Sequence, residues 1–547
     1  MNARAKRWIL LSILSSLALL YLLGNDTIQL WDRDEPRYAQ TSRQMLESGD
    51  WVVPRFLDTV RTAKPVLIYW CQASAMAVLG DTAFAARLPS AVAMLATLAI
   101  LAAALAREVG SNRALWTVFI FGSCALAIGS AKMCLTDAVL LLFITIGQLC
   151  IYRIWRYGVS PVSIIVLGVS IGLAGLTKGP VALGVNLMTV LALAIIDWRV
   201  RPTERTPFDQ RQFTIVVPIV MAMIFIIVMP WLWLIQERAP GFLTQSISHD
   251  VIDRARSGHE GHKWPPGFYT LAVWGTFFPW SLLLVAAGVN AWRQRHQPAT
   301  RFAVAAVVGP WVMFELVAGK LPHYVLPTYP ALAYLVADML VHASRGAFKD
   351  LRKWDFKIAT WVWALLVSAF GFAGWAGVIV AKQYDTVLMI AASAMAIVGV
   401  ATGVRTAMSI QCDRAFAAAR AMGIGMIVLM AIAATFYLPR FAPLRISSNL
   451  ARIMFDAGMS PGEPGYMIDY KEPSLAFHQG GGLREMRENA YLNDSDPAQW
   501  PRWVVITQRS WEKTRPDVQS RWELVGSARG LAYNEGGKQI IHVLRRK

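Results

Sequence analysis

Long apolar runs recur along most of the chain, and they constrain its fold more than any other feature. A helix needs about 20 mainly apolar residues to cross a bilayer, or somewhat fewer where the bilayer thins. Hydrophobic residues make up 55% of the 547 residues, and charged residues only 16%. The sequence therefore predicts a polytopic α-helical membrane protein with about 13 transmembrane helices. The predicted segments are residues 8–23, 84–106, 114–130, 138–152, 162–177, 180–196, 213–235, 267–291, 301–318, 324–343, 357–381, 386–404 and 415–437.

The charged residues between these segments predict how the chain crosses the membrane. With the N-terminus in the cytoplasm, the loops on that side are all basic, as the positive-inside rule requires. They are residues 107–113, 153–156, 199–211, 293–301, 345–357 and 405–414. An odd number of spans then puts the C-terminus outside. Residues 1–23 resemble a signal peptide without an obvious cleavage site, so we expect an uncleaved first span. The shorter apolar run 66–79 is expected to be a re-entrant or interfacial helix.

The formal net charge of +18 needs an explanation. A basic chain can bind nucleic acid, but this one shows neither zinc-ligand cysteine spacing nor a base-stacking module. Basic cytoplasmic loops and sites for anionic membrane lipid account for the charge better. We therefore expect no nucleic acid partner.

The first outside loop carries a high density of charge directly after the first apolar segment. Residues 31–38 read Trp-Asp-Arg-Asp-Glu-Pro-Arg-Tyr, and such charges are costly to bury at a membrane boundary. Pro36 suits the first turn of a helix, on which Asp34, Arg37 and Tyr38 share one face at i, i+3 and i+4. That face can place a base beside an anion site. The alternative is structural: Asp34 caps the helix and Arg37 neutralises it.

Further ionisable residues fall in outside loops along the chain. Any single one can be a capping or snorkelling residue, but function disproportionately sits on loops that a rigid scaffold holds. We therefore expect one site assembled from several loops on the same membrane face. The residues are Lys64 in the first loop, Lys132 and Asp137 in the second, Lys178 in the third, residues 249–263 in the fourth, and Lys320, His323 and Tyr324 in the fifth.

The character of the chain changes after Leu438. Residues 439–547 lack long apolar runs and contain a Gly-Gly-Gly stretch and proline-rich turns. Periodicity predicts an amphipathic helix and four short strands. The helix covers Ile446–Phe455, and the strands cover Gly465–Tyr470, Trp503–Thr507, Arg521–Ser527 and Gln539–Leu544. We expect a membrane domain over residues 1–438 and a small extracytoplasmic α/β domain over residues 439–547.

The chemistry of the outside face favours an enzyme with a lipid-linked substrate. The chain has no glycine-rich phosphate loop, and an activated substrate on that face has to arrive within the bilayer. A polyprenyl-phosphate-linked sugar fits, because lysine and arginine can hold its phosphate while an aspartate accepts a proton from the acceptor hydroxyl. The alternative is a membrane transporter or lipid flippase, marked by ionisable groups deep within spans and by broken helices. Glu315, near the outer end of its span, is the candidate for such a group.

Several short motifs resemble a known family in order and spacing. The first-loop motifs are Asp-Glu-Pro-Arg-Tyr-Ala at 34–39, Met-Leu-Glu-Ser-Gly-Asp-Trp-Val-Val-Pro at 45–54 and Lys-Pro at 64–65. Later motifs are Leu-Thr-Asp at 135–137, Leu-Thr-Lys-Gly at 176–179 and Gly-Lys-Leu-Pro-His-Tyr at 319–324. Over about residues 8–340 the chain resembles the aminoarabinose (lipid A) transferases and the related protein-mannosyltransferase-like enzymes.

The resemblance implies a GT-C type membrane glycosyltransferase of the plasma membrane, the inner membrane in bacteria. Its active site faces the periplasm, its donor is a polyprenyl monophosphate sugar, and its acceptor is a lipid, a glycan or a protein. The catalytic aspartates of the family correspond to Asp34 and Asp137. Residues that bind the donor or its phosphate correspond to Arg37, Tyr38, Lys64, Lys178, Arg254, Lys320 and Tyr324.

The sequence departs from the family pattern at one position. In the lipid A enzymes a glutamate precedes the Lys-Pro lysine and joins two loop histidines on a metal, whereas Ala63 stands there in this chain. His249 and His262 remain as candidate ligands, but two histidines alone make a poor closed metal site. We expect no certain cofactor, and a divalent cation stays open, with Glu260 or Asp250 as the substitute ligand. The departure also leaves the acceptor open.

Overall fold

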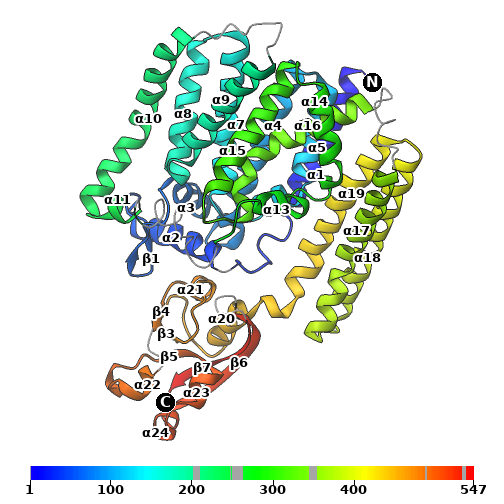
Figure 1. The fold of residues 1–547 in the computed structure, drawn as a ribbon. Helices are drawn as coiled ribbons and strands as arrows, with labels where there is room; N and C mark the ends of the chain where they lie inside the picture. The colour runs from blue at the N-terminus through cyan, green and yellow to red at the C-terminus, as the bar shows by residue number, and fades with distance from the viewer. Residues whose placement is uncertain are drawn as a thin grey trace.

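A bundle of long helices forms most of the molecule, and a small mixed domain lies at one end of it (Figure 1). The computed structural model describes residues 2–31, 33–200, 210–246, 248, 263–343, 354–486, 490–532 and 537–547. The N-terminus lies at the end of the bundle opposite the small domain (Figure 1). An odd number of membrane crossings produces this arrangement.

The helices of the bundle agree with the predicted apolar segments. They are α1 (Ala3–Leu22), α4 (Ala83–Glu108), α5 (Ser111–Gly122), α6 (Ala125–Ala131), α7 (Asp137–Tyr157), α8 (Pro161–Lys178), α9 (Val181–Val200), α10 (Gln210–Arg238), α11 (Phe242–Gln245), α13 (Phe268–Thr276), α14 (Leu284–Arg293), α15 (Pro298–Leu316), α16 (Tyr329–Ala343), α17 (Trp354–Ala381), α18 (Thr386–Gln411) and α19 (Ala415–Ile432). Among the described residues, 11 helices are long and apolar enough to cross a membrane, or up to 13 if each of two bent pairs is one span. The prediction of about 13 transmembrane helices is confirmed.

Two of the predicted spans are not continuous helices. Residues 114–130 divide into α5 and α6, which are bent by 68°. Residues 267–291 divide into α13 and the segment Trp280–Arg293, which are bent by 119° at a break that contains Pro279. Proline has no N–H to continue a helix, and apolar composition alone does not reveal such a bend. The sequence predicted these two spans but not the bend within each of them.

Close contacts between small residues hold neighbouring helices together. A Cβ atom at Gly309 of α15 would lie 2.1 Å from the carbonyl oxygen of Met188 in α9. A Cβ atom at Gly403 of α18 would lie 2.7 Å from the carbonyl oxygen of Ala364 in α17. In a bilayer, helix association depends on such close backbone approach, because lipid tails are as apolar as the side chains.

The loop predicted to be the first outside loop folds into structure of its own at the end of the bundle nearest the small domain (Figure 1). It contains α2 (Asp34–Ser48), the strands β1 (Arg55–Phe56) and β2 (Thr59–Val60), and α3 (Leu67–Leu79). With 13 residues, α3 is shorter than a bilayer-spanning helix. The loop therefore forms a layer between the bundle and the small domain.

The C-terminal domain is a five-stranded mixed sheet with short helices. The strands are β3 (Gly465–Ile468), β4 (Leu483–Met486), β5 (Trp503–Thr507), β6 (Trp522–Ala532) and β7 (Gly537–Arg546), in the order β4-β3-β5-β7-β6. β3 pairs in parallel with β4 and β5, while β7 pairs antiparallel with β5 and β6. The helices are α20 (Ile446–Asp456), α21 (Pro473–Gln479), α22 (Tyr491–Asp494), α23 (Gln508–Glu512) and α24 (Pro516–Gln519). The predicted small α/β domain is confirmed, and the sequence missed β4 and α21.

The C-terminal domain contacts α2 through α21. Nη1 of Arg43 donates a hydrogen bond of 2.9 Å to the carbonyl oxygen of Phe477, and the guanidinium lies 4.1 Å from the centre of the Phe477 ring. Arg43 also pairs with Asp81 and is 5% exposed. Nearby, Arg484 of β4 pairs with Asp58 in the β1–β2 turn. The domain therefore packs against the far side of the layer that carries the candidate site.

Candidate active site

Helix α2 carries the first group of candidate residues. Asp34 and Glu35 form its first turn, where carboxylates favour the positive end of the helix dipole. Asp34, at i, is exposed, Arg37, at i+3, is partly buried, and Tyr38, at i+4, is 4% exposed. Residue Arg33 occupies the N-cap position, and no side chain makes a capping hydrogen bond there. Among the described residues Asp34 therefore lies one position inside the N-cap, and the structural alternative for Asp34 and Arg37 stays a prediction.

Tyr38 joins α2 to the rest of the first loop. Its ring stacks on Tyr69 of α3 with 5.7 Å between ring centres, and the Arg61 guanidinium lies 4.9 Å from the Tyr38 ring centre. Nε of Arg61 donates a 2.9 Å hydrogen bond to the Tyr69 hydroxyl. Burial raises the pKa of Tyr38 well above its ordinary value, and the nearby Tyr69, Asp34 and Asp137 raise it further. The carboxylates of Asp34 on α2 and Asp137 on α7 thus both influence the ionisation of this phenol, against the nearby Arg61.

Asp137, the first residue of α7, is the centre of the second group. Its Oδ1 accepts a 2.7 Å hydrogen bond from Nζ of Lys178 at the end of α8, and its Oδ2 lies 3.8 Å from Nε2 of His323. The Lys178 ammonium also lies 4.7 Å from the centre of the Tyr324 ring. Three loops that are distant in sequence therefore meet at one carboxylate. The sequence had placed His323 in an outside loop without assigning it a role.

Lys64, Asp137, Lys178 and Tyr324 line one cavity of about 710 Å³. This volume lies within the range of about 300–1,000 Å³ that is usual for small-molecule pockets. Lys64 is 9% exposed, and its ammonium donates a 2.6 Å hydrogen bond to the carbonyl oxygen of Ala63, which also lines the cavity. The cavity therefore has a polar end with two ammonium groups and one carboxylate.

The remaining wall of the cavity is apolar. Membrane helices α8, α9, α10 and α15 contribute it through Ile171, Leu183, Ile224, Val228 and Met313. Leu183 is 42% exposed, so this wall is open at the membrane surface of the bundle. A molecule with an anionic head and a long apolar chain matches this combination of a charged end and an apolar wall.

Lys320 lies differently from the other candidate lysines. It is 2% exposed, and its ammonium donates hydrogen bonds of 2.9 Å and 2.6 Å to the carbonyl oxygens of Trp264 and Val317. It therefore holds the loop before η4 (Pro322–Thr328) against the segment before α13. Its neighbour Gly319 lines the cavity, but Lys320 is absent from the described lining residues.

The large fourth loop holds the other predicted residues. Arg254, His249 and His262 lie outside the described residues, as do Asp250 and Glu260. Within the described ranges, no group of three or more His, Cys, Asp or Glu side chains is arranged to hold a metal ion.

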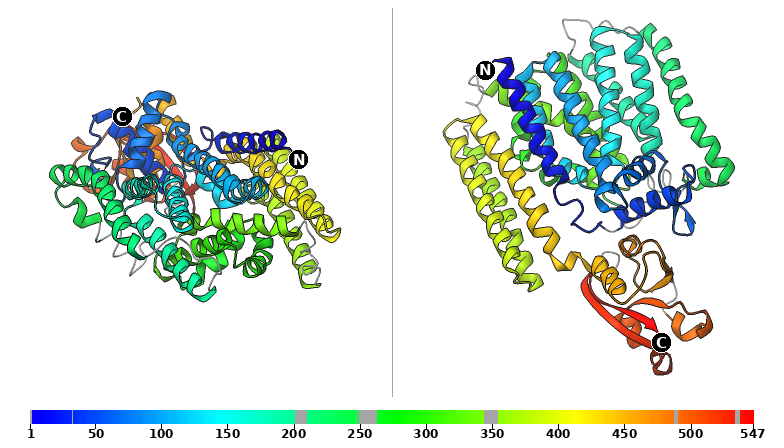
Figure 2. Two further views of the ribbon diagram at one scale, coloured as in Figure 1. Left: turned by 90° about the horizontal axis from the view of Figure 1, so that it is seen from above. Right: turned by 180° about the vertical axis from the view of Figure 1, so that it is seen from behind.

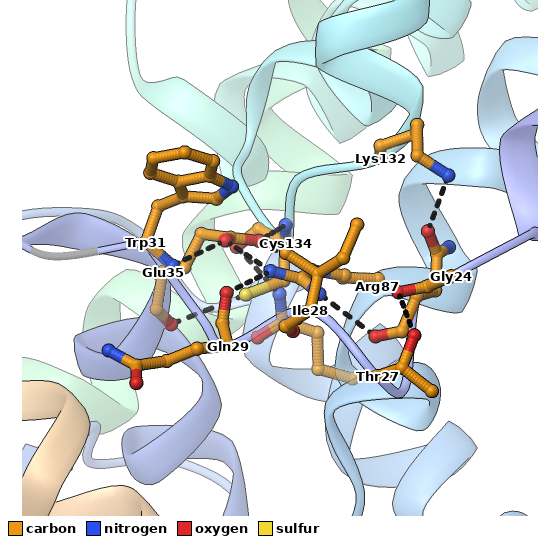
Figure 3. A network of polar contacts seen from close by, with 11 residues as sticks. Gly24, Thr27, Ile28, Gln29, Trp31, Glu35, Arg87, Lys132 and Cys134 are labelled. Carbon is orange, nitrogen blue, oxygen red and sulfur yellow. Dashed lines mark hydrogen bonds and ion pairs between the residues drawn. The ribbon is translucent and has the colours of Figure 1, made fainter. Parts of the chain in front are cut away.

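A fully buried ion pair lies beside the site and was not foreseen (Figure 3). Glu35 and Arg87 are 2% and 1% exposed, and two hydrogen bonds of 2.9 Å and 2.7 Å join their side chains. Arg87 also donates to the carbonyl oxygens of Asn25, Ile28 and Gln29. The Glu35 carboxylate accepts from backbone N–H groups of residues 31 and 134, each at 2.8 Å.

This network fixes the chain on both sides of the candidate site. One carboxylate and one guanidinium hold the segment before α2, the start of α2 and the turn before α7 in place. Asp34 is the first residue of α2 and Asp137 is the first residue of α7, so the network positions both candidate aspartates. The adjacent acidic pair at 34–35 was the available sequence signal, but the partner Arg87 lies far away in sequence and inside a predicted span.

Glu315, the residue that would support the transporter alternative, has a structural role. Glu315 Oε2 accepts a hydrogen bond of 2.8 Å from the N–H of Gly267, and Oε1 accepts one of 3.0 Å from the N–H of Tyr269. These are free N–H groups at the N-terminus of α13, which a carboxylate satisfies well. Glu315 is therefore accounted for as a helix-terminus residue.

Together, these features define a polytopic membrane protein whose loops at one end of the bundle assemble an ionisable cavity beside an apolar, membrane-facing wall. Comparison with known proteins identifies the family within this class. The sequence pattern of the family described as dolichyl-phosphate-mannose-protein mannosyltransferase matches residues 7–246. An undecaprenyl phosphate-alpha-4-amino-4-deoxy-L-arabinose arabinosyl transferase of Yersinia enterocolitica is 31% identical over 399 residues, which cover 70% of each chain. The enzyme of the same name from Serratia proteamaculans is 30% identical, over 62% of this chain and 60% of its own.

The fold agrees with these sequence relationships. A crystal structure of ArnT from Cupriavidus metallidurans bound to undecaprenyl phosphate matches with a TM-score of 0.76 and 18% identity, covering 98% of both chains. The chain therefore belongs to the family that contains the protein mannosyltransferases and the aminoarabinose transferases, and it is a membrane glycosyltransferase.

Proposed function

We propose that the chain transfers a sugar from a polyprenyl phosphate to an acceptor on the outer face of the plasma membrane. The observation that carries this proposal is the cavity in which Lys64, Lys178 and Asp137 stand beside an apolar wall of membrane helices. The names of the relatives supply the specific candidate donor, undecaprenyl phosphate-linked 4-amino-4-deoxy-L-arabinose. The resemblance to lipid A enzymes makes lipid A the first acceptor to test, before other lipids, glycans or proteins.

The charges at the cavity suit this donor. The sugar-linked phosphodiester carries one negative charge, and the released polyprenyl phosphate monoester carries a second. Lys64 and Lys178, offset by Asp137, leave one net positive charge among these cavity-lining groups. Fixed charge aimed at an oxygen whose charge grows during reaction is an effective form of catalysis. Arg37, Arg254 and Tyr38 are the further donor-binding residues of the proposal.

The proposed reaction is a single inverting displacement. The acceptor oxygen forms a bond to the anomeric carbon as the bond from that carbon to the phosphate oxygen breaks. The electron pair leaves with the polyprenyl phosphate, and Asp34 accepts the proton of an acceptor hydroxyl. Asp137, held by Lys178 at 2.7 Å, orients the acceptor or Lys178 itself. Lys320 is not included, because its ammonium already binds two carbonyl groups.

The direct test uses purified protein in lipid nanodiscs with undecaprenyl phosphate-aminoarabinose and lipid A. We expect release of undecaprenyl phosphate and a matching gain of one aminoarabinose mass on lipid A. If the donor is consumed only when another acceptor from the cell envelope replaces lipid A, the proposed donor is correct and the proposed acceptor is wrong. If no polyprenyl phosphate sugar is consumed with any envelope acceptor, the proposed reaction is wrong.

The orientation of the protein is also part of the proposal. We place the site and residues 439–547 on the periplasmic side of the inner membrane, because the predicted cytoplasmic loops are basic and the N-terminus lies at the opposite end of the bundle (Figure 2). Protease added to intact spheroplasts should remove the C-terminal domain. Cleavage only after lysis would reverse the orientation.

The transporter alternative has less support. The two bent helix pairs are features that a transporter shares. Glu315, however, satisfies the N-terminus of α13, and the sequence relationships are to glycosyltransferases.

A further inference from the structure

A second cavity lies at the other end of the bundle, far from the candidate active site. It has a volume of about 430 Å³ and is formed between α9, α14, α15 and α16. We call it the α9–α14 groove and define it by Ile195, Arg199, Gly288, Arg295 and Val308. The last turn of α9 and the end of α14 form part of its lining, at the end of the bundle where the N-terminus lies (Figure 1).

The walls of the groove are apolar and open to the membrane. Ile195 is 61% exposed, Val308 is 47% exposed and Trp292, also in the lining, is 71% exposed. All three lie on membrane helices, so their exposed surface faces lipid. An exposed tryptophan near the end of a membrane helix is typical of the level of the lipid headgroups. The groove is therefore a cleft that an acyl chain can enter from the bilayer.

Three arginines in the lining give the groove a positive charge. Arg301 is 2% exposed and pairs with Asp197 at 2.9 Å, and Asp197 also accepts a 3.0 Å hydrogen bond from the Trp155 ring N–H. Arg199 and Arg295 differ, because within the described part of the chain neither has a carboxylate partner. Their guanidinium groups lie 4.9 Å from the ring centres of the tryptophans that precede them at 198 and 292.

We propose that the groove binds one anionic glycerophospholipid of the leaflet on the N-terminal side. An acyl chain occupies the apolar cleft, and the phosphate lies between Arg199 and Arg295. Charge complementarity carries the choice: the pair Asp197–Arg301 is neutral, which leaves two guanidinium groups for an anion. Basic pockets between membrane helices bind anionic headgroups in this way. The sequence places these arginines in predicted cytoplasmic loops, so the lipid belongs to the cytoplasmic leaflet.

The groove is distinct from the proposed donor site. The polar end of the donor cavity is built from the outer loops, whereas the arginines of the groove lie at the opposite helix ends. A polyprenyl phosphate is also an anionic lipid, so the experiment has to separate the two. The inference does not depend on which sugar or acceptor the enzyme uses.

The first experiment measures lipid binding to the purified full-length protein by native mass spectrometry. Phosphatidylglycerol and phosphatidylcholine with identical acyl chains are the probes. We expect one phosphatidylglycerol to bind at least tenfold more tightly than phosphatidylcholine. In Arg199→Gln/Arg295→Gln we expect phosphatidylglycerol binding to weaken about 30-fold, which corresponds to about 2 kcal/mol at 1.4 kcal/mol per tenfold. Arg405→Gln, an exposed arginine of α18 outside the groove, is the matched control and should bind normally.

A second variant tests the cleft rather than the charge. A Cβ atom at Gly288 would have no heavy atom within 4 Å outside its own helix backbone and chain neighbours. Gly288→Leu should therefore fold, with a better helix former in α14, while its side chain fills the groove. We expect it to lose the bound phosphatidylglycerol with an unchanged thermal midpoint.

Three results would overturn the proposal. Equal binding of phosphatidylcholine would mean that the groove takes any acyl chain without recognising the headgroup. An unchanged preference in Arg199→Gln/Arg295→Gln would place the anionic lipid elsewhere. The third result is that undecaprenyl phosphate displaces the bound phosphatidylglycerol, and that Gly288→Leu abolishes this displacement. It would assign the groove to the donor lipid.

Discussion

Two carboxylate–cation pairs lie at or beside the candidate site: Glu35 with Arg87, and Asp137 with Lys178. They differ in how many of their hydrogen-bonding positions are already occupied. Glu35 and Arg87 are both buried, and the pair makes hydrogen bonds with backbone groups of five further residues, donating three and accepting two. Asp137 and Lys178 share one hydrogen bond, and both line a cavity. The first pair is closed to a ligand, and the second is open to one.

The difference separates charges that build the site from charges that act in it. Taking a charge out of water is costly unless its partners replace the lost hydration, as they do around Glu35. Groups that face a cavity keep free positions for a substrate. Asp34 and Glu35 are adjacent in sequence, yet Asp34 is exposed and Glu35 is buried in the network. Substitutions at these positions can therefore test the comparison.

The largest effect is expected for Asp34→Asn. An amide of the same shape cannot accept the proton of an acceptor hydroxyl, and loss of a general base typically costs about 10²–10⁴-fold in rate. Because Asp34 is exposed and makes no capping hydrogen bond, the free energy of unfolding should change by less than about 0.5 kcal/mol. Turnover with a hydroxyl acceptor and the thermal midpoint are the two measurements. Turnover near that of the unaltered enzyme would falsify the role of Asp34 as a base.

The neighbouring substitution Glu35→Gln should show the opposite pattern. Removing one partner of a buried ion pair costs about 3–5 kcal/mol, because the other charge is left buried. We expect a large fall in thermal stability and in the folded fraction after extraction. The transfer rate per folded molecule should fall much less than in Asp34→Asn. Normal stability with lost transfer would instead move Glu35 into the reacting site.

Lys64 and Lys320 form a matched pair of lysines. Hydrogen bonds to charged groups contribute about 1.5–3 kcal/mol, so Lys64→Ala should weaken donor binding roughly 10- to 100-fold. Lys320→Ala leaves two carbonyl groups without their donor and should lower stability with little change in donor affinity. Titration of both purified variants with polyprenyl phosphate decides between them. Equal donor affinity in Lys64→Ala and the unaltered protein would remove Lys64 from the donor site.

The same contrast explains what the sequence predicted and what it did not. Apolar length located the spans, and a short run of β-branched and aromatic residues located β5 with its correct bounds, because both signals are local. The bend at Pro279 and the four-residue strand β4 were missed, since packing rather than composition defines them. Spacing placed Asp34, Arg37 and Tyr38 on one face of α2, as the structure has them.

The contacts between distant residues were beyond the sequence. Arg87 falls inside a predicted span and was not singled out, yet its partner Glu35 lies in another element. Arg61 was not singled out, although its contacts with Tyr38 and Tyr69 put it beside the predicted residues. Lys64 and Lys320 each lie shortly before a proline in a predicted outside loop. Only their surroundings show that Lys320 holds a loop in place and that Lys64 lines the cavity.

The smallest effect is expected at His478, a largely buried group on the structural side of the comparison. It lies in α21 of the C-terminal domain, beside the contact with α2. Burial, together with the charges of Arg43, Arg87 and Arg445, lowers the pKa of His478 to about 4. In the unfolded chain the pKa returns to about 6.5, so the unfolded state binds more protons between pH 6.5 and pH 4. Stability must then fall as the pH falls through this interval.

From pH 7 to pH 5.5 this single group should lower the free energy of unfolding by about 1 kcal/mol. His478→Gln keeps a polar side chain without a titrating group, so the loss of stability over the same interval should become smaller by that amount. The thermal midpoint of each protein, measured at both pH values, gives the comparison. Because His478 belongs to the C-terminal domain that packs against α2 rather than to the cavity, transfer at pH 7 should be unchanged. An equal pH dependence in both proteins would mean that other carboxyl or imidazole groups carry it, and a loss of transfer at pH 7 would show that this contact also positions Asp34.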